Sequence, residues 1–146
     1  MSFDVRAFAP HDQIEARALI VAGLGEHFGF IDETLNPDLN DIAVAYAHGA
    51  FLVARDAGVV VGTGALTPQL DGSAIVSRMS TAAAHRRRGV ARAVLSALAV
   101  AARERGCTRL VLGTNADWQD AIAFYTAFGF SEMLRTPTGV LFEMAL

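Results

Sequence analysis

Residues 74–92, AIVSRMSTAAAHRRRGVAR, form the most informative stretch of the sequence. Residues 74–81 predict a strand, a loop of small residues follows, and a helix is predicted to begin at or near Gly89. The N-terminus of a helix exposes unpaired backbone N–H groups and carries roughly half a positive charge. Gly89 and the small Ala91 let a ligand approach that backbone, and three arginines (residues 86–88) add side-chain charge. The stretch therefore predicts a turn that holds a phosphate or pyrophosphate. A capped helix with a solvated arginine face is the alternative that the local pattern leaves open.

Positive charge is concentrated in the middle of an acidic chain. The formal net charge is −3, and every one of the 12 basic residues is an arginine. Six of these arginines fall between Asp71 and Glu104, where the sequence has no carboxylate. A focused positive region of this kind favours an anionic ligand over a long polyanion. The other common phosphate loops, G-x-x-x-x-G-K-[ST] and G-x-G-x-x-G after a strand, are absent from the sequence.

The rest of the chain shows strand and helix patterns on both sides of this stretch. Upstream, we predict a strand over 3–9, a helix from an N-cap at Asp12 to a stop at Gly29, a short helix over 38–47, and a hairpin of strands 51–55 and 59–66. Downstream, we predict a helix over 90–105, a strand over 109–114, a helix over 117–128, and strands over 130–134 and 140–146. The predicted order is β-α-α-β-β-β-α-β-α-β-β, which indicates a mixed sheet with packed helices and an α/β or α+β fold class.

Length and composition limit the remaining classes of protein. The 146 residues, 53% of them hydrophobic, predict a single domain over 1–146 with one core. The single cysteine, Cys107, excludes a disulfide framework within the chain, and the scattered histidines predict no metal site. No apolar run reaches the roughly 18 residues of a membrane-spanning helix, and the N-terminus lacks a signal-peptide pattern. We therefore expect a soluble cytoplasmic protein with no membrane partner.

Two motifs resemble those of the GNAT superfamily of N-acetyltransferases. Arg86-x-x-Gly89-x-Ala91 is similar to the acyl-CoA pyrophosphate loop of that family, [QR]-x-x-G-x-[GA]. Residues 121–130, AIAFYTAFGF, are similar to its second signature, A-x-x-x-Y-x-x-x-G-F. The predicted order of elements also resembles the family fold, so the resemblance covers nearly the whole chain. It implies a GNAT-like mixed, mostly antiparallel sheet flanked by helices. The implied activity is direct transfer of an acetyl group from acetyl-CoA, the co-substrate, to a primary amine.

The resemblance implies roles for individual residues. In the family, the backbone of the strand before the loop pairs with the pantetheine amides and faces the thioester; the matching residues here are Met79, Ser80 and Thr81. The loop and first helical turn around the pyrophosphate match Arg86, Arg87, Arg88, Gly89, Val90, Ala91 and Arg92. Tyr125 matches the residue that protonates the departing CoA thiolate in many members. That role suits a phenol, which is a weak acid with a pKa of about 10.

Two positions depart from the family pattern. Trp118 stands where many relatives have an asparagine that contacts CoA, and we expect it either to pack between helix and sheet or to line the cofactor site. Gly113 stands where some peptide-acetylating members have a glutamate as general base. An amine must lose its proton before it attacks the thioester, so the identity of the base stays open. Candidate bases in the N-terminal half are Glu26, His27, Asp32 and Glu33. His85, which precedes the three arginines, is expected to be an exposed loop residue.

More than one acceptor and more than one class of function are consistent with the sequence. We expect a small-molecule amine rather than a protein tail, because the first helices show no acidic groove that would attract basic peptides. The residues expected to line its pocket are Phe28, Phe30, Leu35 and Tyr46. A protein or peptide N-acetyltransferase is one alternative, and a CoA-binding sensing module without catalysis is another. No nucleic-acid partner is expected, because residues 78–92 contain no aromatic side chain. The oligomeric state, with a homodimer among the options, stays open.

Overall fold

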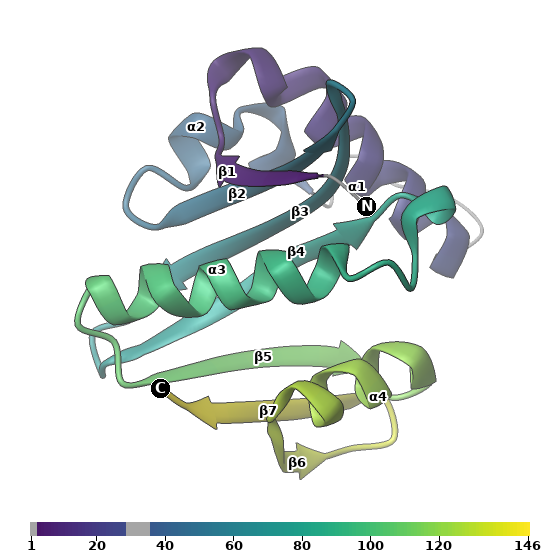
Figure 1. Cartoon of the computed structure of the whole chain (residues 1–146). Coiled ribbons are helices and arrows are strands. Elements are labelled where there is room, and N and C mark those ends of the chain that lie inside the picture. Colours follow the sequence, from purple (N-terminus) through teal and green to yellow (C-terminus); the bar gives the residue numbers. More distant parts are fainter. Residues whose placement is uncertain (1–2, 29–35) are drawn as a thin grey trace.

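The computed structural model describes residues 3–28 and 36–146, which form one seven-stranded sheet with helices on both faces (Figure 1). The strands are β1 (Asp4–Ala7), β2 (Ala50–Asp56), β3 (Val59–Pro68), β4 (Ser73–Thr81), β5 (Arg109–Asn115), β6 (Ser131–Arg135) and β7 (Gly139–Ala145). The α-helices are α1 (Gln13–Phe28), α2 (Ile42–Ala45), α3 (Val90–Glu104) and α4 (Gln119–Phe128). Short 3-10 turns lie at Pro10–Asp12, Pro37–Asn40 and Ala83–His85.

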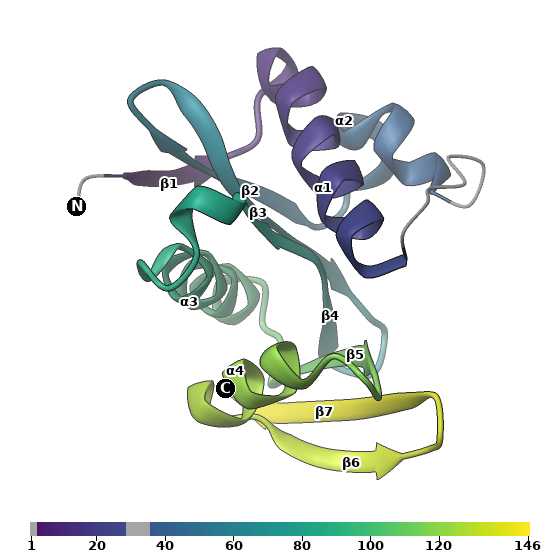
Figure 2. The same ribbon diagram turned by 90° about the vertical axis from the view of Figure 1, so that its right-hand side faces the viewer.

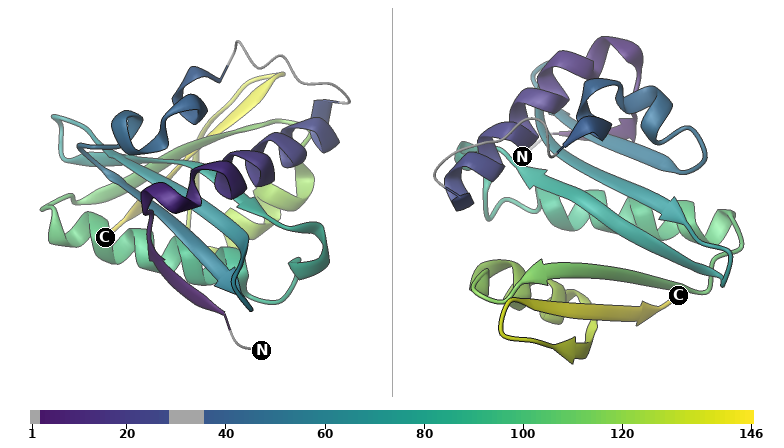
Figure 3. Two further views of the ribbon diagram at one scale, coloured as in Figure 1. Left: turned by 90° about the horizontal axis from the view of Figure 1, so that it is seen from above. Right: turned by 180° about the vertical axis from the view of Figure 1, so that it is seen from behind.

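The sheet is mixed and mostly antiparallel. Its strands lie in the order β1-β2-β3-β4-β5-β7-β6, and β4 with β5 is the parallel pair. The helices α1 and α2 cover one face of the β1–β4 half, and α3 lies on the opposite face together with α4 (Figure 2). The view from above shows α1 and α3 on opposite sides of the strands (Figure 3). The predicted fold class and the predicted order of strands and helices are therefore confirmed.

The main core lies between the sheet and α3. The residues of α3 that are buried follow the spacing of three and four that predicted the helix, and they are Val90, Val94, Leu95, Leu98, Ala99 and Ala102. Gly64 in β3 lets this helix approach closely, because a Cβ there would lie 2.7 Å from both Val94 Cγ1 and Met79 Sδ. A smaller cluster on the other face joins α1 to β2 and β3.

The local predictions were less accurate in the N-terminal half. The predicted helix over 38–47 is a 3-10 turn, Pro37–Asn40, followed by the four-residue helix α2. The first strand covers Asp4–Ala7 rather than 3–9. The predicted stop at Gly29 lies outside the described residues. In the described ranges, no helix combines the length and the apolar composition that crossing a bilayer requires.

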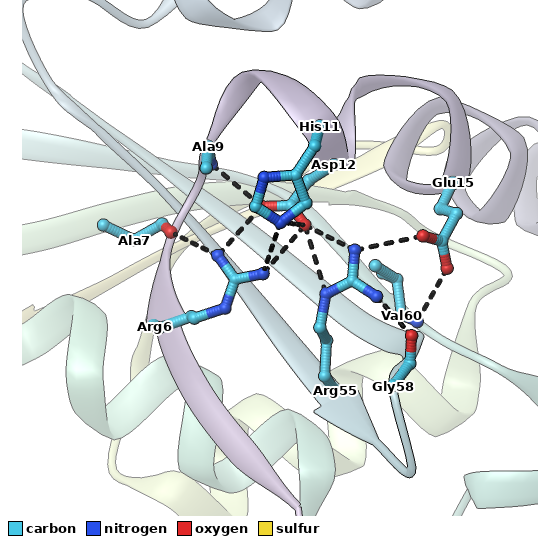
Figure 4. Close-up of polar contacts among 9 residues, drawn as sticks. All are labelled: Arg6, Ala7, Ala9, His11, Asp12, Glu15, Arg55, Gly58 and Val60. Carbon is cyan, nitrogen blue, oxygen red and sulfur yellow. Dashed lines mark hydrogen bonds and ion pairs between the residues drawn. The ribbon is translucent and has the colours of Figure 1, made fainter.

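Asp12 has a different role from the predicted helix cap. It directly precedes α1, but its fully buried carboxylate turns back and accepts a 2.8 Å hydrogen bond from the Ala9 N–H (Figure 4). Two arginines also reach it: Arg55 Nη2 lies 2.6 Å and Arg6 Nη2 lies 3.0 Å from Asp12 Oδ1. Burial alone raises the pKa of Asp12, but the hydrogen bonds from Arg55, Ala9 and Arg6 lower it more, so the net pKa lies below its usual value. Asp12 therefore joins β1, the start of α1 and the end of β2.

Replacing Asp12 with Asn should destabilise the fold strongly. The variant keeps the shape of the side chain but leaves two arginines without their buried counter-charge. Removing one partner of a buried ion pair costs about 3–5 kcal/mol, and partial exposure of Arg6 places this case at about 3 kcal/mol or less. Thermal unfolding should show a Tm lower by several degrees, whereas Asp71→Asn, which removes an exposed Arg109 pair, should change Tm little.

The same variant should change how stability depends on pH. Because the folded-state pKa of Asp12 is lowered, its stabilisation is complete above the unfolded-state pKa and is lost as pH falls through the folded-state pKa. Wild-type Tm should therefore fall more steeply than that of Asp12→Asn below about pH 4. Equal slopes for the two proteins would show that Asp12 carries no such linkage.

Candidate active site

The strands β4 and β5 separate after a short shared stretch. Their parallel pairing covers only Ser73–Ile75 against Arg109–Val111, and both strands then continue for several residues. The ribbon shows them diverging towards their C-terminal ends (Figure 1, and Figure 3, right). Among the described strands, none pairs with the β5-facing edge of β4 beyond Ile75. Met79, Ser80 and Thr81, the residues that the family resemblance assigns to the pantetheine arm, lie in this stretch of β4.

A β-bulge interrupts β4 just before these residues. Thr63 of β3 is opposite Ser80 and Ala65 is opposite Ser77, so Arg78 and Met79 together face the single residue Gly64. Arg78 has a φ of +54°, in the left-handed region that residues other than glycine rarely adopt. Bulges of this kind break the regular ladder and occur often beside active sites. No local sequence pattern predicted this bulge.

The loop after β4 ends at the N-terminus of α3, as predicted. Gly89 is its N-cap residue with a φ of +82°, and a Cβ at this position would meet nothing within 4 Å. The first helical hydrogen bond runs from the Ala93 N–H to the Gly89 carbonyl at 3.0 Å. The N–H groups of Val90, Ala91 and Arg92 therefore have no acceptor within the helix. The backbone at this turn is open, and its partial charge is positive.

The predicted arginine cluster is present, but its members differ in their contacts. Arg87 and Arg88 are exposed beside Gly89. Arg86 Nη2 donates a 2.6 Å hydrogen bond to Glu26 Oε2 of α1, with both side chains about half exposed. Arg92 places its guanidinium carbon 5.8 Å from the centre of the Phe128 ring, which joins α3 to α4.

Two residues of the basic stretch were misinterpreted. His85 was expected to be exposed, but its side chain is only 20% exposed and its Nε2 lies 2.9 Å from Asp56 Oδ2 of β2. This contact fixes the loop to the sheet. Arg78 was counted with the anion-binding arginines, but it binds Asp38, and its Nη2 lies 2.6 Å from Asp38 Oδ1. The sequence held one hint of a different role for Arg78, because it is the only charged residue in the strand predicted over 74–81.

Tyr125 lies on α4 in an aromatic cluster. It is 8% exposed, and its ring packs against Phe124, Phe130 and Phe142 with centroid distances of 5.2, 5.6 and 6.3 Å. Burial raises the pKa of the Tyr125 hydroxyl to about 12. The hydroxyl therefore keeps its proton at every ordinary pH, and it has no hydrogen-bond partner in the described part of the chain.

A hollow of about 350 Å³ lies at the C-terminal end of β5. Its lining consists of Gly113, Thr114, Asn115, Trp118, Leu134, Thr136, Gly139, Val140 and Leu141. No charged side chain appears among these described lining residues. Trp118 lines this hollow, and neither of its two expected roles, packing between helix and sheet or lining the cofactor site, is tested by that position. Gly113, the position that lacks the family glutamate, lies in the same lining.

The predicted bases and pocket residues are only partly described. Glu26 is the described candidate base, and its carboxylate binds Arg86. The side chains of His27 and Phe28, and residues 29–35, which include Phe30, Asp32, Glu33 and Leu35, lie outside the described part of the chain. Tyr46 packs on Phe51 of β2 and lines a second hollow of about 270 Å³ beside α2. Across the described residues, no cluster of three metal-ligating side chains forms.

The comparison with known proteins agrees with this geometry. The sequence model of the Acetyltransferase (GNAT) family matches residues 19–130 of this chain. The chain is 35% identical over 108 residues to "Probable N-acetyltransferase family 8 member 5" of Mus musculus, covering 69% of this chain and 48% of that protein. The chain thus spans about half the length of the curated relatives that it matches.

Solved structures show the same fold. A GNAT-family acetyltransferase of Staphylococcus aureus superposes with a TM-score of 0.91 at 20% identity, covering 99% of both chains. The PaiA N-acetyltransferase of Thermoplasma acidophilum, solved in complex with coenzyme A, superposes with a TM-score of 0.86 at 14% identity, covering 100% of both chains.

Proposed function

This chain belongs to the GNAT acetyltransferase family, and from that premise we propose that it transfers an acetyl group from acetyl-CoA to a primary amine. The observation that carries the proposal is the bulged strand β4, which leads through an arginine-rich loop to the open N-terminus of α3. The neutral amine attacks the thioester carbonyl directly, without a covalent acyl-enzyme. The carbon–nitrogen bond forms, the carbon–sulfur bond breaks, the nitrogen loses a proton to water or to a base, and the leaving thiolate is protonated. Such a reaction depends mainly on positioning and electrostatic stabilisation by the protein.

The residues at the turn fit a pyrophosphate. Gly89 leaves the backbone uncovered, because nothing lies within 4 Å of the position of a Cβ. The N–H groups of Val90, Ala91 and Arg92 are free of intrahelical acceptors and would bind the phosphate oxygens. Arg87 and Arg88 would add charge from the loop. Arg86 would exchange its exposed pairing with Glu26 for a phosphate, which costs little because exposed ion pairs are weak.

The edge of β4 and Tyr125 would serve the acyl end of the co-substrate. Met79, Ser80 and Thr81 lie on an edge without a partner strand among the described residues, so their backbone groups can pair with amides of the pantetheine arm. The backbone N–H near Met79 would polarise the thioester carbonyl. Tyr125 is protonated throughout the working range of pH and can donate its proton, or a hydrogen bond, to the leaving sulfur.

The acceptor is proposed to be a small amine whose body occupies the hollow at the end of β5. Gly113 places this hollow beside the strand position from which the family glutamate acts. The described lining is apolar or uncharged, with Trp118, Leu134 and Leu141 as its largest members. It offers no acidic surface for a basic peptide, which supports the preference for a small molecule.

A screen of amines and peptides tests this proposal. Acetyl-CoA should raise the Tm of the protein through mass action, and at least one small amine should cause release of free thiol. The departure at Gly113 favours one second candidate, a CoA-binding sensing module. Tight binding of acetyl-CoA with no thiol release for any amine would support that candidate. No binding of acetyl-CoA would contradict both.

The rate of transfer should climb with pH towards the pKa of the amine itself. Gly113 offers no base at the β5 position where some relatives have a glutamate. The amine must then lose its proton to water or to a weakly basic side chain of the N-terminal half. A profile of kcat/KM against pH checks this. A plateau that begins at about pH 6–8 would instead reveal a positioned carboxylate or histidine.

Single replacements identify any hidden base. Glu26→Gln, His27→Asn, Asp32→Asn and Glu33→Gln should each lower turnover by less than about tenfold if no positioned base exists. One variant that removes activity at every pH would identify the base and contradict the climbing profile.

A further inference from the structure

Arg78 stands in a backbone conformation that suits glycine. Two residues of β4 face one residue of β3 at the bulge, and in bulges whose first residue is left-handed that residue is a glycine. Here it is an arginine with a φ of +54°. A residue other than glycine stays in this region only when its surroundings hold it there, and such positions cluster at functional sites.

The surroundings hold Arg78 at both ends. Its carbonyl accepts a 2.8 Å hydrogen bond from the hydroxyl of Thr63, which is fully buried in β3. Its guanidinium binds Asp38 in a two-pronged contact, with Nε 2.9 Å from Oδ2 and Nη2 2.6 Å from Oδ1. Nη2 also donates to Asn36 Oδ1 at 3.0 Å. Paired contacts of this kind between arginine and carboxylate fix direction as well as distance.

Tyr46 also binds the carboxylate of Asp38. Its hydroxyl donates a 2.6 Å hydrogen bond to Asp38 Oδ2. Asp38 and Arg78 are 26% and 19% exposed, so water screens this pair less than it screens a surface pair. Burial raises the pKa of Asp38, but the hydrogen bonds from Arg78 and Tyr46 lower it more, so the net pKa lies below its usual value. The carboxylate therefore stays charged across any assay range.

These contacts join the strand of the proposed site to a segment distant in sequence. Asp38 and Asn36 belong to the segment around the turn Pro37–Asn40, and Arg78 belongs to the strand that would receive the thioester. We call Arg78, Asp38, Tyr46 and Asn36 the Arg78 anchor. The residue after Arg78 is Met79, which shares Gly64 of β3 with Arg78 at the bulge.

We propose that the Arg78 anchor is a positioning device, in which Asp38 and Tyr46 hold Arg78 in its left-handed conformation and thereby set the bulge that presents the backbone of Met79 to the thioester. This inference rests on the proposed function. Arg78 acts through the backbone of its neighbour and is not a catalytic residue. Glycine would adopt this positive φ with less strain. The presence of an arginine is explained by its side chain, which connects the bulge to the segment around residues 36–46.

Two variants remove the anchor in different ways. Asp38→Asn removes the charge that holds the guanidinium. Arg78→Gly removes the whole side chain, so that no contact holds the backbone in the positive φ that glycine tolerates but does not require. Both should lower kcat by on the order of 10²-fold, because a small displacement of a positioned group costs that much. The Kd for acetyl-CoA should change much less than kcat, since the proposed pyrophosphate contacts lie at residues 86–92.

Controls separate positioning from general damage. Asp71→Asn makes the same change in an arginine-paired aspartate before the start of β4, and it should leave kcat unchanged. The double variant with Asp38→Asn and Arg78→Gly should be no slower than the slower single variant, because both changes remove one interaction. Wild-type kcat in both single variants, with or without a lower Tm, would overturn the proposal. So would a loss confined to acetyl-CoA affinity.

Amide hydrogen exchange tests the anchor without relying on activity. In Asp38→Asn, the amides of residues 76–81 should exchange faster than in wild type, while those in the middle of α3 should not change. Unchanged exchange at 76–81 would overturn the proposal even if catalysis is confirmed. If the wild-type protein acetylates no amine, the proposed function fails, and the exchange result still decides whether the anchor holds the bulge.

Discussion

Replacing Gly89 with Glu should abolish the stabilisation of the protein by acetyl-CoA. At a ligand concentration of 100 times Kd, binding stabilises a folded protein by about 2.7 kcal/mol, which corresponds to a rise in Tm of roughly 8 °C for a chain of this size. The new carboxylate would stand at the N-terminus of α3, where the proposed pyrophosphate binds to the N–H groups of Val90, Ala91 and Arg92. It would repel the phosphates and occupy their place. The Tm of the variant should not respond to acetyl-CoA.

Gly106 provides a matched control at the other end of the same helix. It has a φ of +78°, close to the +82° of Gly89, and a Cβ at either position would meet nothing within 4 Å. Gly106→Glu therefore brings the same backbone strain and the same charge, but far from the N–H groups of the first turn. It should lose similar stability and keep the full Tm response to acetyl-CoA. A Tm response that survives in Gly89→Glu would contradict the pyrophosphate assignment.

The fold was predictable because its signals are local. The apolar spacing of α3 and the stop at Gly106 define that helix within about 17 residues, and the buried face appears as expected. The motif around Gly89 likewise depends on neighbours in sequence, so the strand, loop and helix N-terminus appear in the predicted order. By contrast, the segment 38–47 had apolar residues at helical spacing but formed only a turn and four helical residues. Short helices gain too little from propensity to be read reliably from sequence.

The rest of the candidate site depends on distant partners. Arg78 meets Asp38 across 40 residues, Arg86 meets Glu26 across 60, and His85 meets Asp56 across 29. No spacing rule connects such pairs, so arginines that looked alike in sequence have different contacts in the fold. The bulge was missed for a related reason: glycine, asparagine and aspartate are the residues that signal a positive φ, and here the position holds an arginine.

Replacing Tyr125 with Phe should lower turnover by about 10²–10⁴-fold, the usual range for a positioned acid. The change deletes only the hydroxyl and keeps the ring among Phe124, Phe130 and Phe142. Because the hydroxyl has no hydrogen-bond partner among the described residues, its loss leaves no buried group unpaired. The effect is measured as the rate of thiol release with an amine from the screen. The Tm and the Kd for acetyl-CoA should stay near wild type.

The pKa of Tyr125 determines how its contribution depends on pH. Burial raises this pKa to about 12, and a free thiol has a pKa of about 8.5, so complete proton transfer to a thiolate in water would be unfavourable. Beside the buried hydroxyl, however, a thiolate loses solvation as well, which raises its own pKa and makes the proton from Tyr125 easier to accept. Tyr125 stays protonated below about pH 11, so the ratio of wild-type to Tyr125→Phe turnover should be constant across the profile. A ratio near one at every pH would assign the proton to water and leave Tyr125 as a packing residue of the aromatic cluster.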